Sequence, residues 1–132
     1  MATERPPVLV VDDDPLIRKM LRIGLGWDGY TVYEAPDGAV ALAHLRATTD
    51  RMIVLLGIMM PVMNGFEVLQ SVVADTTLAT QHRYIIVTGS YLALESPEGQ
   101  QMLAQLDAPI VRKPFTPAQI LDAVEQARLK LV

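Results

Sequence analysis

The chain has 132 residues, of which 51% are hydrophobic and 20% are charged. That is the length of one ordinary domain, and the composition is too apolar and too weakly charged for a disordered chain. The lack of cysteine excludes a disulfide scaffold and a thiolate zinc site. The two histidines, His44 and His82, cannot form a zinc site by themselves, and we expect both to be solvated.

The net charge is −4, and the Lys and Arg residues form no continuous stripe. Wide contact with nucleic acid phosphates is therefore not expected. The longest apolar runs, such as 52–60, are far shorter than the ~20 residues of a membrane span. No apolar signal segment follows the N-terminus. These observations predict a cytoplasmic protein that binds neither nucleic acid nor a membrane.

Short apolar runs alternate with longer amphipathic ones, a pattern typical of repeated βα units. Strands are predicted over 8–11, 30–34, 52–56, 84–87 and 109–112. Helices are predicted after the N-caps Asp14, Asp37 and Thr116, and over 66–74 and 97–106. The run 52–56 is the most apolar and predicts the central strand. Trp27 and Tyr30 flank a turn, and we expect both to be partly buried.

The pattern therefore predicts a single α/β domain over residues 7–132. A short flexible lead-in over residues 1–6 precedes it, and no output domain is expected. In an open parallel sheet, ligands bind beyond the carboxyl ends of the strands. The residues that follow those ends are Asp12, Asp13 and Asp14 after the first strand, Gly57 after the third, Thr88 after the fourth, and Lys113 with Pro114 after the fifth.

Carboxylates that face a hydroxyl and an ammonium suit a hard divalent cation beside a phosphate. Mg²⁺ would take the carboxylates, while Thr88 and Lys113 would contact phosphate oxygens. A plainer interpretation is that Asp12–Asp14 only cap the following helix, and we assign this role to Asp14. Met59, Met60 and Met63 are expected to be packing residues rather than ligands of a soft metal.

Four segments carry a resemblance to a known family: 8–15, 58–65, 87–89 and 112–115. In this order and spacing they are similar to the receiver domain of bacterial two-component response regulators, over about residues 7 to 130. The resemblance implies a flavodoxin-like doubly wound fold with a five-stranded parallel sheet in the order 2-1-3-4-5. It also implies a signalling rather than an enzymatic function.

The resemblance further implies site roles, residue by residue. Asp12 and Asp13 correspond to the acidic pair that holds Mg²⁺, and the backbone carbonyl of Met59 corresponds to a further metal ligand. Thr88 corresponds to the hydroxyl that moves toward the phosphoryl group, and Lys113 to the family's ammonium. Pro114 stands where the family usually has a cis peptide.

Two positions depart from the family pattern. Receivers accept a phosphoryl group on an aspartate that ends the third strand, and here that position is Gly57. The usual phosphotransfer cannot occur at a residue without a side chain, and Mg²⁺ affinity is expected to be weak, with no cofactor required. The switch position, usually Tyr or Phe, is Ile110, which has no ring to move. Without the aspartate, Lys113 is expected to pair with Asp12 or Asp13.

The first hypothesis is a stand-alone receiver-like domain that acts through protein contacts with a histidine kinase or another signalling protein. Homodimerisation is possible through the face formed by 97–106, 109–112 and the last helix, where Leu92, Leu94, Met102 and Leu103 are candidate contact residues. The alternative is a Mg²⁺-dependent phosphoacceptor in which Gly57 has replaced a natural aspartate, or in which Asp13 takes its place. A flavodoxin-like cofactor binder is disfavoured, because the loops lack a Ser/Thr/Gly-rich phosphate cradle.

Overall fold

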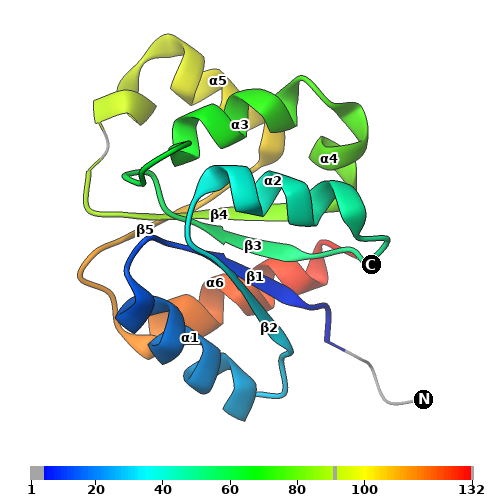
Figure 1. Cartoon of the computed structure of the whole chain (residues 1–132), viewed down its shortest axis with the longest axis vertical. Helices are drawn as coiled ribbons and strands as arrows, with labels where there is room; N and C mark the ends of the chain where they lie inside the picture. Colours follow the sequence, from blue (N-terminus) through cyan, green and yellow to red (C-terminus); the bar gives the residue numbers. More distant parts are fainter. Residues whose placement is uncertain (1–4, 91, 132) are drawn as a thin grey trace.

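A computed structural model describes residues 5–90 and 92–131 as a three-layer α/β fold (Figure 1). The strands are β1 (Val8–Val11), β2 (Val32–Ala35), β3 (Ile53–Leu56), β4 (Arg83–Thr88) and β5 (Ile110–Arg112). The helices are α1 (Pro15–Trp27), α2 (Gly38–Ala47), α3 (Gly65–Val73), α4 (Thr76–Gln81), α5 (Pro97–Leu106) and α6 (Pro117–Leu129), with a short 3₁₀ turn η1 (Leu92–Glu95).

The strands pair in parallel in the order β2-β1-β3-β4-β5. This confirms the expected doubly wound sheet with β3 at its centre. β1 and β3 are buried along their whole length, as expected for strands that are covered by helices on both faces. Helices α1 and α6 cover one face, and α2, α3 and α5 cover the other (Figure 1).

The helix starts follow the sequence signals. The side chains of Asp14 and Asp37 accept hydrogen bonds from Leu16 N and Val40 N, which satisfies first-turn donors of α1 and α2. Asn64 and Thr116 form capping boxes at α3 and α6. These caps fix where each helix leaves the carboxyl edge of the sheet, and so they position the loops that carry the candidate site.

Two elements were not predicted. The short helix α4 lies between α3 and β4, and η1 lies between β4 and α5. In α4 only Leu78 is buried, so no apolar periodicity marks it, and it begins at the cap Asp75. In η1 only Leu94 is buried. Of the predicted lead-in, residues 1–4 lie outside the described residues, and Arg5 lies over the Tyr30 ring at 5.6 Å.

The expected burial of four residues needs correction. His82 is buried, and its Nδ1 accepts a hydrogen bond from Met52 N at 3.0 Å, so it is not solvated. Trp27 is 87% exposed rather than partly buried, because it lies on the outer side of α1 at its last residue. Tyr30 is buried and donates a hydrogen bond to Glu125 on α6. The other histidine, His44, is half-buried, so it is only partly solvated.

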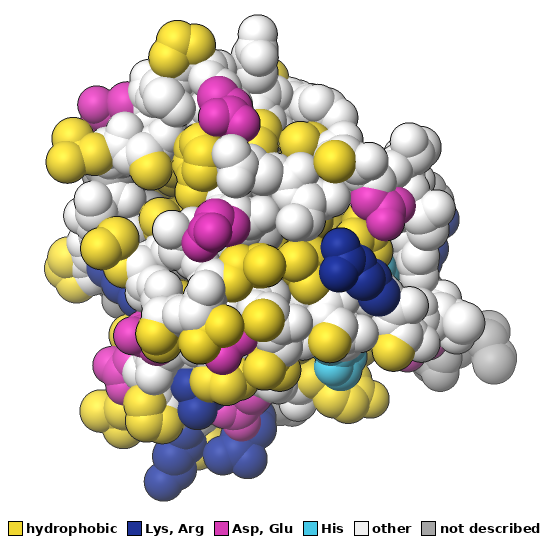
Figure 2. All heavy atoms as spheres, turned by 45° about the horizontal axis from the view of Figure 1, so that its top comes forward, with side chains coloured by type: hydrophobic (Ala, Val, Ile, Leu, Met, Phe, Trp, Pro, Cys, Tyr) yellow, Lys and Arg dark blue, Asp and Glu magenta, His cyan; other side chains and the backbone are white. Residues whose placement is uncertain are grey.

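None of the helices in the described residues is long and apolar enough to cross a bilayer. On the face seen in Figure 2, Lys and Arg side chains stand in a few separate groups, and apolar and acidic side chains lie between them. That face offers no continuous basic surface.

Candidate functional site

The sheet brings the predicted site residues to one edge. Parallel pairing places Val11 beside Leu56 and Leu56 beside Ile86, so the residues that follow β1, β3 and β4 leave the sheet next to one another. Gly57 N donates to Val11 O at 2.8 Å, and Lys113 N donates to Thr88 O at 3.0 Å. These two backbone hydrogen bonds therefore join the end of β3 to the end of β1, and the end of β5 to the end of β4.

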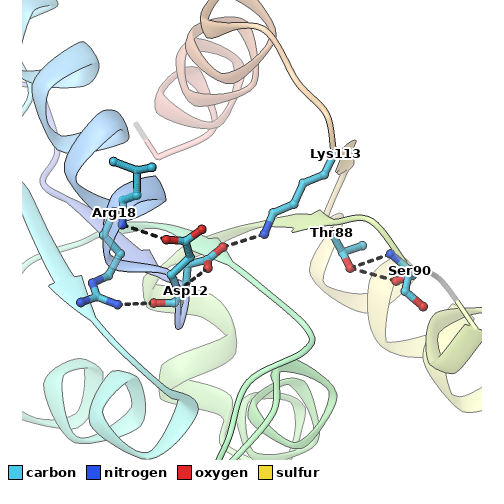
Figure 3. Close-up of polar contacts among 7 residues, drawn as sticks. Asp12, Arg18, Thr88, Ser90 and Lys113 are labelled. Carbon is cyan, nitrogen blue, oxygen red and sulfur yellow. Dashed lines mark hydrogen bonds and ion pairs between the residues drawn. The ribbon is translucent and has the colours of Figure 1, made fainter.

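The central contact of the site is an ion pair. Lys113 Nζ lies 2.8 Å from Asp12 Oδ2 (Figure 3), which confirms the predicted pairing and identifies Asp12 as the partner. Asp12 is 4% exposed, whereas Lys113 is partly buried. Removal of the ammonium would leave a buried carboxylate without its charged partner.

Two further contacts hold Asp12. Its Oδ1 accepts from Asp14 N at 2.9 Å, and its backbone oxygen accepts from the Arg18 guanidinium at 2.7 Å (Figure 3). Arg18 also pairs with Glu34 on β2 at 3.1 Å. The sequence reasoning missed Arg18, although its position one turn into α1 places it over the strand end.

The remaining acidic residues do not complete a metal site. Asp13 is exposed, and the Asp14 side chain caps α1. Within the described residues, no three His, Asp or Glu side chains gather as metal ligands. Both oxygens of Asp12 already accept hydrogen bonds. The donor set therefore fits Mg²⁺ poorly, because the ion would have to displace Lys113 and would find one exposed carboxylate beside Asp12.

Thr88 is turned toward its own loop. Its Oγ1 donates to Ser90 O at 2.9 Å and accepts from Ser90 N at 3.1 Å (Figure 3). The side chain is buried at 3% exposure. The hydroxyl is thus held by the backbone after β4 and is not a partner of the Asp12–Lys113 ion pair.

Gly57 lies close to the end of β1. A Cβ atom at this position would lie 3.1 Å from Val11 O and 3.6 Å from Asp12 Oδ2. The first distance is tight, and the second places any side chain at residue 57 directly beside the Asp12 carboxylate. Gly57 does not have a positive φ, so its backbone conformation does not itself require glycine.

The loop that follows Gly57 is shaped by close backbone approach. A Cβ at Gly65 would lie 2.0 Å from Gly57 O, so only glycine allows α3 to start this close to the strand end. Val62 in the same loop has φ +68° and is 82% exposed. A β-branched residue in the left-handed region is strained. Met59 is exposed in this loop as well, with a side chain that faces solvent.

The remaining predicted positions lie at β5 and the helix beside it. Ile110 is the first residue of β5 and is 36% exposed, so it does not fill apolar space in the core. The Lys113–Pro114 peptide is cis. Of the four candidate contact residues, Leu92 is exposed. Leu94 in η1 and Met102 in α5 are buried and cannot contribute to a contact surface. Leu103 is half-buried.

Comparisons with known proteins agree with this fold. Residues 8–125 match the family described as the response regulator receiver domain. A DNA-binding response regulator, MtrA of Mycolicibacterium smegmatis, is 33% identical over 130 residues, which cover 98% of this chain and 53% of that protein. The chain thus spans about half the length of the curated relatives it matches.

Solved structures show the same arrangement. The chemotaxis response regulator CheY4 of Vibrio cholerae has a TM-score of 0.76 and 30% identity, and the match covers 93% of this chain and 98% of that one. A CheY-like receiver domain from Methanospirillum hungatei has a TM-score of 0.78 at 24% identity and covers 96% of each chain. The latter identity supports the fold alone.

Proposed function

The chain belongs to the receiver domains of two-component response regulators, and we propose that within this family it signals through protein contacts without phosphorylation at the end of β3. The observation that carries this proposal is Gly57. It follows β3 directly, at the edge where Asp12, Thr88 and Lys113 also lie. Phosphoryl transfer to a receiver needs a carboxylate nucleophile, and residue 57 supplies none.

The neighbouring contacts support the same proposal. Lys113, which in an active site of this kind would contact a phosphoryl oxygen, is engaged by Asp12 at 2.8 Å. Thr88 is engaged by Ser90. Both groups that would respond to a phosphoryl group are thus satisfied within the chain. A partner that binds one arrangement of these loops better than another would shift the population without chemistry.

The proposed partners are a histidine kinase or another signalling protein. We also propose that the chain can form a homodimer through the face made by α5, β5 and α6. A groove of about 990 Å³ runs along that face and is lined by residues of α5, β5 and α6, including Leu103, Ile110 and Asp122. Mg²⁺ binding is proposed to be weak and not required. One relative is described as a DNA-binding regulator, whereas we propose that this chain contacts no nucleic acid, because its Lys and Arg residues form no continuous stripe.

A second candidate function has its own support. Asp12, Asp13, Thr88 and Lys113 are all present at the carboxyl edge of the sheet, and a side chain at residue 57 would start 3.6 Å from Asp12 Oδ2. These features favour a Mg²⁺-dependent phosphoacceptor in which glycine has replaced a natural aspartate. The two functions differ in whether an aspartate restored at residue 57 would accept a phosphoryl group.

The test of the proposal is whether the chain takes up a phosphoryl group. We expect no covalent adduct after incubation with acetyl phosphate and Mg²⁺, as measured by intact mass. An acid-labile adduct on any aspartate, Asp13 included, would refute the proposal.

A further inference from the structure

A second concave feature lies on the opposite face of the sheet from α3. It is a groove of about 430 Å³ between α1 and the start of α6, and we call it the α1–α6 groove. Its walls are mainly apolar and include Met20, Ile23, Trp27, Phe115 and Leu121. This volume lies within the range of small-molecule sites, which are typically about 300–1,000 Å³ and predominantly apolar.

The α1 wall of the groove is more exposed than a packed helix face. Met20, Ile23 and Trp27 are 50%, 44% and 87% exposed, while the core face of the same helix buries Leu21 and Leu25. Exposed apolar side chains that cluster around a groove mark a binding site, because a ligand that covers them removes apolar surface from water. The cluster contains the chain's only tryptophan.

Gly24 keeps the groove open. It lines the groove from the middle of α1, and a Cβ at this position would meet no atom within 4 Å. Glycine inside a helix costs about 1 kcal/mol relative to alanine. Packing among the described residues therefore does not require glycine at this position, and the space beside it is open.

The charge in the groove has one sign. Asp28 is the charged residue of its lining, it is exposed, and it forms no ion pair with the part of the chain that the structure describes. It lies at the carboxyl end of α1, whose last turn contains no basic residue. The negative end of the helix dipole therefore adds to the carboxylate, and the adjacent Trp27 ring also favours a cation.

From these observations we propose that the α1–α6 groove binds an amphiphilic organic cation. Its aromatic or aliphatic body would lie between Trp27 and Phe115 over Gly24, and its ammonium group would lie at Asp28. The site does not involve Gly57 or Lys113, so this inference stands or falls independently of the proposed function.

The test uses the emission of Trp27, which is unambiguous because the chain has no other tryptophan. The full chain is titrated with 4-phenylbutylamine. Matched ligands are 4-phenylbutyrate, which has the same body with the opposite charge, and butylamine, which has the charge without the ring. We expect saturable binding of the aromatic amine, with affinity for the carboxylate lower by on the order of tenfold and no saturation with butylamine.

Two variants locate the site. Gly24→Leu fills the groove and is expected to abolish binding, whereas Ala43→Leu, which adds the same side chain to an exposed position of α2, leaves binding unchanged. Asp28→Asn is expected to weaken binding of the amine several-fold and to leave binding of neutral 4-phenylbutanol unaltered. Amide chemical-shift changes in the unmodified chain should be confined to α1 and the start of α6.

Equal affinity for the amine and the carboxylate, or shifts elsewhere in the chain, would overturn the proposal. The proposal would also be overturned if none of the ligands saturated the Trp27 emission while the amide chemical shifts showed an intact fold. A protein partner would then be the better occupant of the groove.

Discussion

Lys113 Nζ lies 2.8 Å from Asp12 Oδ2, and this contact joins the loop after β5 to the end of β1 across the edge of the sheet. Asp12 is buried at 4% exposure, and a third of the Lys113 side chain remains accessible to solvent, at 30%. The contact therefore combines a desolvated carboxylate with a partly hydrated ammonium. Its loss should cost stability chiefly through the carboxylate that is left behind.

We predict that Lys113→Met lowers the free energy of unfolding by about 1–2 kcal/mol, less than for a fully buried pair because water screens the ammonium. Urea denaturation at neutral pH measures the change. The exposed Lys19→Met is the matched control and should change stability little. An unchanged stability in Lys113→Met would show that Asp12 does not depend on this partner.

A carboxylate at residue 57 should create a dependence on Mg²⁺. In Gly57→Asp the new side chain would start 3.6 Å from Asp12 Oδ2, so two carboxylates would repel unless a cation joins them. We expect Mg²⁺ well above its Kd to stabilise this variant by about 1–3 kcal/mol and the unmodified chain much less. Thermal unfolding with Mg²⁺ and after chelation measures both.

Gly57→Asn is the control for that experiment, because its side chain has the same shape without the charge. It should show no stabilisation by Mg²⁺. If Gly57→Asp and Gly57→Asn respond alike, the added carboxylate does not face Asp12 as the structure implies.

His82 should make stability depend on pH. Its burial lowers the pKa from the ordinary 6.5 to about 4. Between these values the unfolded chain binds a proton that the folded chain does not, so the free energy of unfolding falls as the pH is lowered from 6.5 to 4. The loss from this group reaches up to about 3 kcal/mol at the acidic end of this window.

Urea denaturation of the chain and of His82→Gln between pH 4 and pH 7 isolates this effect. The glutamine keeps an acceptor for Met52 N and does not titrate, so the pH dependence should become shallower. A slope that survives in His82→Gln would assign the pH dependence to other groups.

Val62 offers a stabilising substitution. It is a β-branched residue at φ +68°, and its side chain is 82% exposed, so its removal would sacrifice little burial. We expect Val62→Gly to raise the free energy of unfolding by about 1 kcal/mol, because glycine adopts this conformation without strain. Val62→Ala keeps a Cβ in the left-handed region and should recover less. Equal stability of the three proteins would mean that the loop relaxes at no cost.

The sequence predicted the sheet well because each strand is a short β-branched run that is bounded by turn residues. The predicted strand over 52–56 differs from β3 by one residue, and the sheet order implied by the resemblance is confirmed. The predicted strand over 30–34 was less accurate, because β2 lies at a sheet edge and is less apolar; it starts two residues before β2 and ends one residue before it. α4 was missed because a helix with one buried residue carries no periodic signal.

Side-chain environments were harder to predict than elements. That Lys113 pairs with Asp12 rather than with Asp13 depends on which of two adjacent carboxylates turns inward at the end of β1. His82 and Trp27 were assigned the wrong burial because both lie at element ends, where one residue of register decides which way a side chain faces. Gly65 ends the segment 58–65 that contributes to the family resemblance, and only the structure shows that it makes room for Gly57 O.

Residue 57 offers no side chain that a phosphoryl group could occupy, and the intact mass of the chain is the measurement that tests this. The chain and its Gly57→Asp variant are incubated side by side with acetyl phosphate and Mg²⁺. An adduct on the variant alone would show that Asp12, Thr88 and Lys113 still form a competent pocket, which favours the second candidate function. We expect no mass increase in the chain with Gly57, and one added phosphoryl group there would refute the proposed function.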